Sequence, residues 1–245
     1  MSSQTIILIS GANRGLGFEA AKNLVIFDNY HVILGCRDLA KAQKAADTLR
    51  ALPSLKGSIS TVQLDVTNIS SITAAKEYIE TTFSGLDILV NNAAIYILNP
   101  TDPGDALRAS LNTNVIGVAA LTKAFIPLLQ KSARPRLVLV SSSNGSLTYN
   151  SDPDSPHGGT HAMEYRVTKA AVNMLLVQYH ASLKKIVVVG VDPGFCATDA
   201  IGDADALRKM GAAEPEVGGE IIASVVNGEK GEPGMVYGPQ GIIPW

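Results

Sequence analysis

The chain has 245 residues, of which 46% are apolar and 17% charged, a composition that supports a sizeable core and excludes intrinsic disorder. Its 20 Lys and Arg residues nearly balance 22 Asp and Glu residues, and a net charge of −2 excludes a polybasic surface for nucleic acid or anionic membranes. No linker or repeat divides the sequence, so we expect one domain over residues 1–245.

The N-terminus carries no basic region, and its first apolar run ends in a glycine-rich turn, so no signal peptide is expected. No uninterrupted apolar stretch approaches the roughly 18–20 residues of a membrane span. Two cysteines, Cys36 and Cys196, are too few for a disulfide framework. We therefore expect free thiols, a cytoplasmic location and no membrane partner.

Short β-branched and apolar runs recur along the chain, as is typical of strands buried on both faces of a parallel sheet. These runs are Ile6–Ile9, Val32–Leu34, Val62–Leu64, Ile88–Val90, Leu137–Val140, Ile186–Val191 and Met235–Tyr237. Between them lie helix-length segments with apolar residues three and four apart, such as the stripes Leu16, Ala20, Leu24, Phe27 and Ile69, Ile72, Ala75, Ile79, Phe83. This alternation predicts an α/β, Rossmann-like, doubly wound parallel sheet of about seven strands with helices on both faces.

Two segments interrupt the alternation. The first, about residues 146–162, is rich in Pro, Gly, Ser and Asp and predicts a long loop. The second, about residues 195–215, contains a short helical pattern between turn signals. Long loops in a compact domain often cover an active site, so both are expected to shape a substrate pocket, and surface loops without a function are the alternative.

A glycine-rich turn, Ser10-Gly11-Ala12-Asn13-Arg14-Gly15-Leu16-Gly17, directly follows the first predicted strand and opens a helix. Such a turn lets the backbone approach a pyrophosphate, whose charge the helix N-terminus favours. The position therefore predicts a dinucleotide site, with an ordinary tight turn as the alternative. The Lys-Ser/Thr pair of a P-loop is absent from the turn.

The end of the second predicted strand should lie beside the adenosine ribose. An acidic residue there would select NAD, but Cys36 occupies that place and Arg37 follows it. Together with Arg14, Arg37 supplies two guanidinium groups that suit a 2′-phosphate. We therefore expect NADP(H) to be preferred over NAD(H), with two solvated surface arginines as the alternative.

Tyr165 and Lys169 stand four residues apart at the start of a predicted helix and share one of its faces. A free tyrosine has a pKa of about 10, which a neighbouring ammonium would lower toward the range of acid–base catalysis. A serine-rich turn follows the fifth predicted strand, where a hydroxyl could bind a substrate oxygen. In isolation, a surface pair and a plain serine turn would be the simpler interpretations.

Taken together, these motifs closely resemble the short-chain dehydrogenase/reductase family, over nearly the whole chain. The Gly-x-x-x-Gly-x-Gly turn, the Asn-Asn-Ala-Ala stretch, the Tyr-x-x-x-Lys pair and the Pro-Gly-x-x-x-Thr stretch occur in the family's order. The C-terminal ending is similar to that of carbonyl-reductase-like members and of fungal polyketide ketoreductases of the norsolorinic acid type.

The resemblance implies specific roles. The implied catalytic residues are Asn114, Ser142, Tyr165 and Lys169, with Ser143 as the alternative serine. The implied cofactor-binding residues are Gly11, Asn13, Arg14, Gly15, Leu16, Gly17, Arg37, Asp65, Val66, Asn91, Asn92, Ala93, Tyr165, Lys169, Pro193, Gly194 and Thr198.

Three departures from the family pattern concern the turn and the substrate side. Ser10 replaces a threonine, Ala94 replaces a glycine, and 23 positions separate Ser142 from Tyr165, more than is common in the family. The additional residues fall in the predicted loop at 146–162. For this reason the resemblance does not identify a substrate.

The implied function is NADPH-dependent reduction of a carbonyl in a ketone or aldehyde, with alcohol oxidation as the reverse reaction. A non-catalytic NADP-sensing protein is the alternative, although the four implied catalytic positions are intact. His157 and His161 lie four apart across a glycine pair without an evident third ligand, so no metal site is expected. The expected partners are a small-molecule carbonyl or alcohol and, as a homodimer or homotetramer, further copies of the chain through helices near 105–131 and 162–183.

Overall fold

The computed structural model describes residues 4–158 and 161–245. Two stretches lie outside this description: residues 159–160 of the predicted loop, and residues 1–3 of the N-terminal segment, for which no signal peptide is expected. Within the described ranges the chain forms one sheet of eight strands in the order β3-β2-β1-β4-β5-β6-β7-β8. The strands are β1 (Thr5–Ser10), β2 (Tyr30–Cys36), β3 (Ser58–Gln63), β4 (Ile88–Asn91), β5 (Arg136–Val140), β6 (Val187–Val191), β7 (Val236–Gly238) and β8 (Gly241–Ile243).

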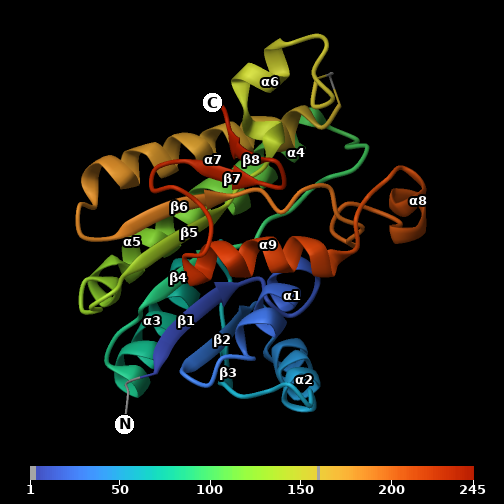
Figure 1. Cartoon of the computed structure of the whole chain (residues 1–245). Helices are drawn as coiled ribbons and strands as arrows, with labels where there is room; N and C mark the ends of the chain where they lie inside the picture. The colour runs from blue at the N-terminus through green and yellow to red at the C-terminus, as the bar shows by residue number, and fades with distance from the viewer. Residues whose placement is uncertain (1–3, 159–160) are drawn as a thin grey trace.

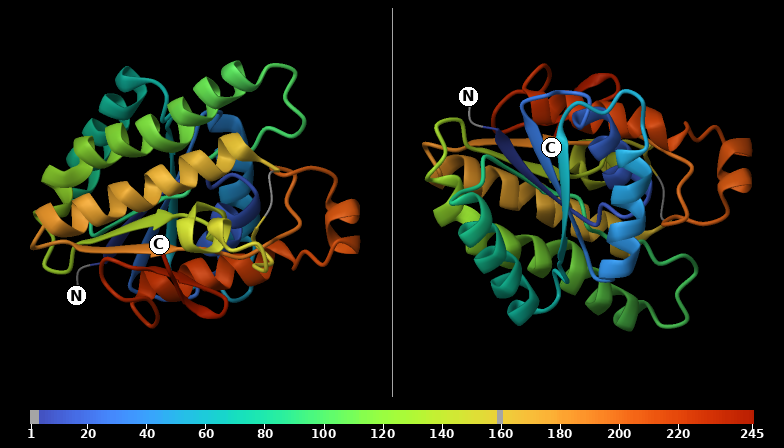
Figure 2. Two further views of the ribbon diagram at one scale, coloured as in Figure 1. Left: turned by 90° about the horizontal axis from the view of Figure 1, so that it is seen from above. Right: turned by 90° about the horizontal axis from the view of Figure 1, so that it is seen from below.

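Helices cover both faces of this sheet (Figures 1 and 2). They are α1 (Gly15–Leu24), α2 (Leu39–Arg50), α3 (Ile69–Phe83), α4 (Pro103–Leu111), the π-helix η1 (Asn112–Gly117), α5 (Val118–Leu129), the 3₁₀-helix η2 (Ser143–Gly145), α6 (Leu147–Ser151), α7 (Met163–Ser182), α8 (Ala204–Lys209) and α9 (Pro215–Asn227). The predicted doubly wound α/β fold is confirmed.

The alternation of side chains along the strands divides the core into two layers. In β1, Ile7 and Ile9 face the layer that contains α1, α2 and α9, whereas Leu8 faces the layer of α3, α5 and α7. All three are fully buried. Strands apolar on both faces are what a parallel sheet covered on both sides requires.

The ends of the predicted elements differ from the observed ones for local reasons. The helix α1 stops at Leu24, so Phe27 lies beyond it and is exposed, and Ile69 opens α3 on its solvent side. The strand β3 begins at Ser58, earlier than the predicted Val62, because an edge strand accommodates polar residues that hide its pattern. An eighth strand, β8, pairs antiparallel with β7 at the opposite edge.

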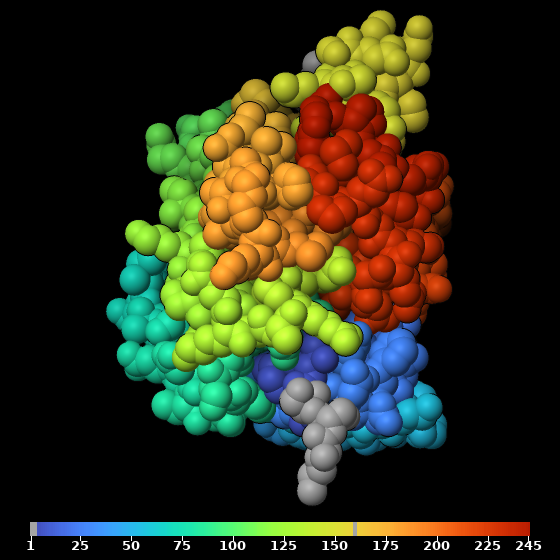
Figure 3. Space-filling model, turned by 60° about the vertical axis from the view of Figure 1, so that its left-hand side comes forward, coloured from blue at the N-terminus to red at the C-terminus, as the bar shows by residue number. Residues whose placement is uncertain are grey.

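The predicted loop at 146–162 begins with a short helix, α6, which the sequence pattern did not indicate. Ser146 caps it by accepting a hydrogen bond from the backbone N–H of Tyr149. The backbone N–H of Thr148 donates to the carbonyl oxygen of Trp245 at 2.8 Å, which ties α6 to the C-terminus. Figure 3 shows the yellow segment around α6 projecting from the body of the molecule above the red C-terminal segment.

One helical stretch among the described residues, Pro103–Leu129, is long and apolar enough to cross a membrane by length and composition. Its second half is α5, in which Leu121, Phe125 and Leu128 are fully buried against the sheet. This packing is that of a core helix of a doubly wound domain.

Candidate active site

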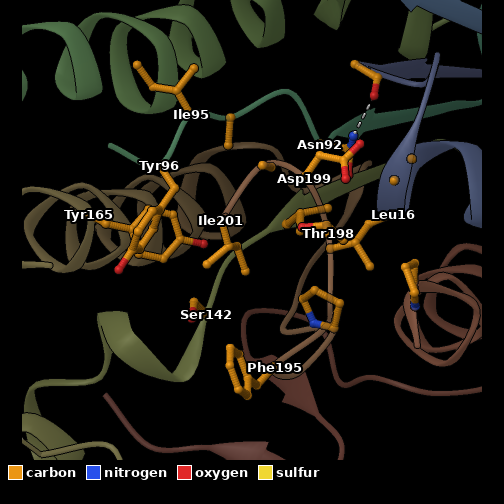
Figure 4. A pocket seen from close by; sticks show the side chains of 18 of the residues that line it. Leu16, Asn92, Ile95, Tyr96, Ser142, Tyr165, Phe195, Thr198, Asp199 and Ile201 are labelled. Atoms are coloured by element: carbon orange, nitrogen blue, oxygen red, sulfur yellow. Dashed lines mark hydrogen bonds between the residues drawn. The ribbon is translucent and has the colours of Figure 1, made fainter. Parts of the chain in front are cut away.

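A cleft of about 1220 Å³ opens at the carboxyl ends of the parallel strands, where ligands bind in folds of this kind. The sequence-predicted residues that line it are Gly11, Asn13, Arg14, Gly15, Leu16, Gly17, Arg37, Asp65, Val66, Asn92, Ala93, Ser142, Tyr165, Lys169, Pro193, Gly194 and Thr198. The side of the cleft that contains Tyr165, Ser142 and Thr198 is drawn in Figure 4. The fold thus gathers most of the predicted residues around one cavity.

The glycine turn between β1 and α1 has the backbone geometry that its sequence predicts. Gly11 and Gly15 have φ angles of +69° and +58°, a region that glycine adopts without strain. A Cβ on Gly11 would lie 3.0 Å from the backbone of Ala93, whereas one on Gly15 would meet nothing closer than 3.9 Å. At Gly15 the backbone therefore faces open space in the cleft.

The N-terminus of α1 is free to bind an anion. Its N-cap, Arg14, makes no side-chain capping bond, and the first turn contains no acidic residue. The backbone N–H groups of the turn and the helix dipole therefore suit the pyrophosphate of a dinucleotide.

Hydrogen bonds of Ser10 and Asn92 brace the turn against the end of β4. The Ser10 hydroxyl donates to the carbonyl oxygen of Val90 and accepts from the backbone N–H groups of Asn92 and Ala93, at 3.0–3.3 Å. The Asn92 amide donates to the carbonyl oxygen of Ser10 at 2.8 Å. The serine at this departure from the family pattern retains the hydroxyl that the bracing needs.

Two basic side chains, Arg14 and Arg37, line the cleft near the glycine turn. Arg14 is exposed, with one Nη atom 3.8 Å from the Asp199 carboxylate. Beyond Arg14, a smaller hollow of about 440 Å³ is lined by Lys41 and Lys44 of α2, which sequence reasoning missed. Their spacing on α2 is an ordinary helical one, so nothing in the sequence indicated that they share a hollow with the turn.

Two predicted site residues do not line the cleft. Asn91 is buried and donates to the Thr122 hydroxyl at 3.0 Å, while its Oδ1 has no partner among the described residues. Asn114 is also buried, in the π-helix η1, and its amide donates to the carbonyl oxygen of Ile95 and to the Thr168 hydroxyl. The bond to Thr168 links Asn114 to the part of α7 that contains Lys169.

Tyr165 and Lys169 lie on the first turns of α7, beside the end of β5. The Lys169 ammonium donates to the carbonyl oxygen of Val140 at 2.7 Å and lies 5.3 Å from the centroid of the Tyr165 ring. Ser142, the N-cap of η2, lies on the same side of the cleft (Figure 4). These positions bring a hydroxyl, a phenol and an ammonium together at the strand ends.

The two adjacent serines have different surroundings. Ser143 is buried and donates from both its backbone N–H and its hydroxyl to the Asp192 carboxylate, which also accepts from the N–H of Gly194 at 2.8 Å. Ser142 accepts a bond from the backbone N–H of Asn144, and both serines line the cleft. The Ser142 hydroxyl, unlike that of Ser143, is not bound by the Asp192 carboxylate and interacts with the Tyr165 phenol.

Burial is the main cause of the pKa shifts of Tyr165 and Lys169. Burial raises the pKa of Tyr165 above its usual value, with Asp192 adding to the rise and the Ser142 hydroxyl opposing it. Burial lowers the pKa of Lys169 to about 8, a fall that the negative charge of Asp192 opposes. The pKa of Tyr165 is therefore raised and not lowered as expected, because burial of the phenol and the negative charge of Asp192 outweigh the Ser142 hydroxyl.

The other end of the cleft is apolar and aromatic. The Tyr96 ring lies against Tyr165, with 5.1 Å between ring centroids, and Phe195 and Ile201 project from the segment after β6 (Figure 4). That segment is closed at its base, where the N–H of Ala213 donates to the carbonyl oxygen of Phe195 at 2.9 Å. Sequence reasoning missed Tyr96, for which the position two residues after Ala94 was the available signal.

Among residues 4–158 and 161–245, no group of three or more His, Cys, Asp or Glu side chains is placed to hold a metal ion. Cys36 and Cys196 are free and buried. Burial raises the pKa of the Cys196 thiol to about 11, so this cysteine is a packing residue near the cleft.

A family model described as short chain dehydrogenase matches residues 5–208. Among curated proteins, the short-chain dehydrogenase/reductase tropE of Talaromyces stipitatus is 34% identical over 94% of this chain and 93% of its own length. The short-chain dehydrogenase anuI of Penicillium roqueforti is 37% identical over 80% of this chain and 81% of its own length.

Two solved structures of reductases are also similar to this chain. The NADPH-bound carbonyl reductase from chicken fatty liver superposes with a TM-score of 0.82 at 26% identity, covering 99% of this chain and 100% of that one. Salutaridine reductase from Papaver somniferum gives a TM-score of 0.77 at 25% identity, covering 96% and 99%.

Proposed function

The chain belongs to the short-chain dehydrogenase/reductase family, and from this premise we propose that it is an NADPH-dependent carbonyl reductase acting on a ketone or aldehyde. The observation that carries the proposal is the meeting of Ser142, Tyr165 and Lys169 at the open side of one cleft. An NADPH-bound carbonyl reductase of similar structure supports it.

The residues present fit a dinucleotide. The uncapped N-terminus of α1 and the open space at Gly15 would take the pyrophosphate, and Asp65 and Val66 would flank the adenine. Arg14 and Arg37, with Lys41 and Lys44 nearby, favour a 2′-phosphate over a free ribose hydroxyl. When bound, the nicotinamide supplies a hydride for the carbonyl carbon.

In this mechanism the chain's own residues hold the carbonyl oxygen and deliver a proton to it. The Ser142 and Tyr165 hydroxyls donate hydrogen bonds to the substrate oxygen and stabilise the negative charge that develops there. Because burial raises the Tyr165 pKa, the phenol is protonated at neutral pH and can serve as the acid in reduction. The Lys169 ammonium orients the cofactor ribose, and Asn114 anchors a water chain that returns the proton.

The test is oxidation of NADPH and, separately, of NADH at 340 nm against ketones, aldehydes and quinones. We expect turnover with NADPH and a weaker response with NADH, together with tighter binding of NADPH in paired titrations. An NADH preference would overturn the cofactor assignment. Tight NADPH binding without turnover of any carbonyl would favour the cofactor-sensing alternative.

We further propose that the protein is cytoplasmic and forms a homodimer or homotetramer through the helices near 105–131 and 162–183. Each of these two regions presents large apolar side chains to solvent: Ile116 in η1, and Met163, Val167 and Met174 in α7. Light scattering after size exclusion is expected to give two or four copies, and a monomer would refute the assembly.

A further inference from the structure

Arg166 directly follows the proposed catalytic tyrosine on α7, and its side chain is unusual for an arginine. The residue is only 8% exposed. Among the described residues, no carboxylate oxygen lies within 4.0 Å of its guanidinium, so no ion pair accounts for its burial. A buried charge of this kind is retained only where hydrogen bonds satisfy it.

Those hydrogen bonds all go to the segment that precedes α7. The Nε atom donates to the carbonyl oxygen of His161 at 2.8 Å, and Nη2 lies 2.9 Å from Nε2 of the same histidine. The Nη1 atom donates to the carbonyl oxygen of His157 at 2.6 Å and to Oδ1 of Asn150. A guanidinium is the one side chain whose rigid fork of five N–H donors can serve three such partners at once.

Asn150 extends these contacts to the serine turn. Its amide nitrogen donates to the carbonyl oxygens of Asn144 at 2.9 Å and Ser146 at 2.6 Å. The backbone N–H of Asn144 in turn donates to the Ser142 hydroxyl at 3.2 Å. We call these contacts of Arg166 and Asn150 the Arg166 network. It joins the serine turn, the segment before α7 and the helix that carries Tyr165.

Among the described residues, few other contacts hold residues 151–158 in place. Residues 151–154 are exposed, and the backbone bonds of this part are local ones, such as Ser155 N–H to the carbonyl oxygen of Asp152. The stacking of His157 on Tyr149, with 5.1 Å between ring centroids, is its one aromatic contact among the described residues. A segment with few buried apolar contacts opens at low free-energy cost unless polar contacts anchor it.

The anchored segment forms part of the cleft wall, through Pro156, His157 and His161. We propose that Arg166 is a positioning residue for substrate: it holds this wall beside Tyr165, so that substrates are bound by a fixed surface. The inference rests on the proposed function only in naming the bound molecule as a carbonyl substrate. It assigns a function to the residues that lengthen the spacing between Ser142 and Tyr165.

The test uses Arg166→Ala, Arg166→Lys and Asn150→Ala, the last of which changes the network at a residue outside α7. Arg108→Ala, at an exposed arginine, is the control. For the best substrate of the carbonyl panel, we expect KM to rise about tenfold or more in Arg166→Ala, as losing a charged hydrogen-bond donor predicts. In that variant kcat should change less than about threefold and the Kd of NADPH should stay unchanged, because the hydrogen bonds of Arg166 itself go to His157, His161 and Asn150 and not to the proposed catalytic or cofactor-binding groups. Arg166→Lys, which keeps the charge but not the fork, should fall between.

Hydrogen exchange of residues 150–158 is measured on the same proteins without substrate. It should quicken about tenfold or more in Arg166→Ala and Asn150→Ala and stay unchanged in Arg108→Ala. Unchanged exchange and KM would overturn the proposal, as would a loss of kcat at constant KM, which would mean that Arg166 acts on Tyr165 instead. If Arg166→Ala does not fold, the other two network variants decide. Absence of turnover in the unaltered protein would defeat the carbonyl reductase assignment, while the exchange rates would still test the network.

Discussion

The two ends of the cleft are built by different means. At the end proposed for the cofactor, the turn between β1 and α1 contributes mainly backbone, and its shape depends on small residues: a Cβ on Gly17 would lie 2.5 Å from the Asn92 amide nitrogen. At the end proposed for the substrate, long side chains from distant segments, such as Tyr96, Arg166 and Phe195, form the walls. A site made of backbone tolerates few residue types, whereas a site made of side chains depends on which loops meet there.

The largest effect that this comparison predicts is at the substrate end. Tyr165→Phe removes the proposed proton donor, and kcat for carbonyl reduction should fall about 10²- to 10⁴-fold. NADPH binding, which depends mainly on the other end, should persist. Tyr78→Phe, on the solvent side of α3, is the control and should match the unaltered protein. Equal rates in both variants would remove Tyr165 from the mechanism.

At the cofactor end, Gly17→Ala should destabilise the fold. Its Cβ would also lie 2.9 Å from the carbonyl oxygen of Gly11, a backbone atom that cannot move without distorting the turn. Overpacking of this kind lowers the free energy of unfolding by about 1–3 kcal/mol, measurable in urea. Gly85→Ala is the matched control, since its Cβ would meet the Lys131 Cβ at 3.6 Å. Similar losses in both variants would contradict the role of the turn.

Arg37→Ala tests whether side chains also matter at the cofactor end. Loss of a guanidinium from the proposed 2′-phosphate site should raise the Kd of NADPH about tenfold and leave that of NADH unchanged. Calorimetric titration of both cofactors measures this, with the exposed Arg134→Ala as control. A parallel weakening of both cofactors would show that Arg37 does not distinguish them.

The last predicted effect, no larger than that of Arg37→Ala, is the dependence on pH. Burial lowers the Lys169 pKa to about 8, so the ammonium is present below that pH and is lost as the pH rises through it. Because the raised pKa keeps the Tyr165 phenol protonated over the same range, kcat should fall about tenfold between pH 7 and pH 9 through Lys169 alone. A profile that is flat to pH 9 would rule out this titration.

The sequence alone determined the parts that neighbouring residues encode. The Gly11–Gly17 turn depends on local backbone freedom, the strands on short apolar runs, and the shared face of Tyr165 and Lys169 on the helical repeat. These features follow from φ angles and periodicity within a few residues. For this reason the fold class and the place of the cleft could be predicted before any contact was known, whereas Asp65, Asn92 and Pro193 were expected only from the family resemblance.

Tertiary structure alone decided what depends on partners far along the chain. The Asp192 carboxylate accepts hydrogen bonds from Ser143, 49 positions away, and not from Ser142. Asn91 donates to the Thr122 hydroxyl, and β8 pairs as an antiparallel edge strand. The Arg166 network is decided in the same way, because a guanidinium in sequence does not specify which carbonyl oxygens will surround it. Local patterns set backbone conformation, but the partners of a polar side chain and the net effect of burial on a pKa exist only once distant segments have packed together.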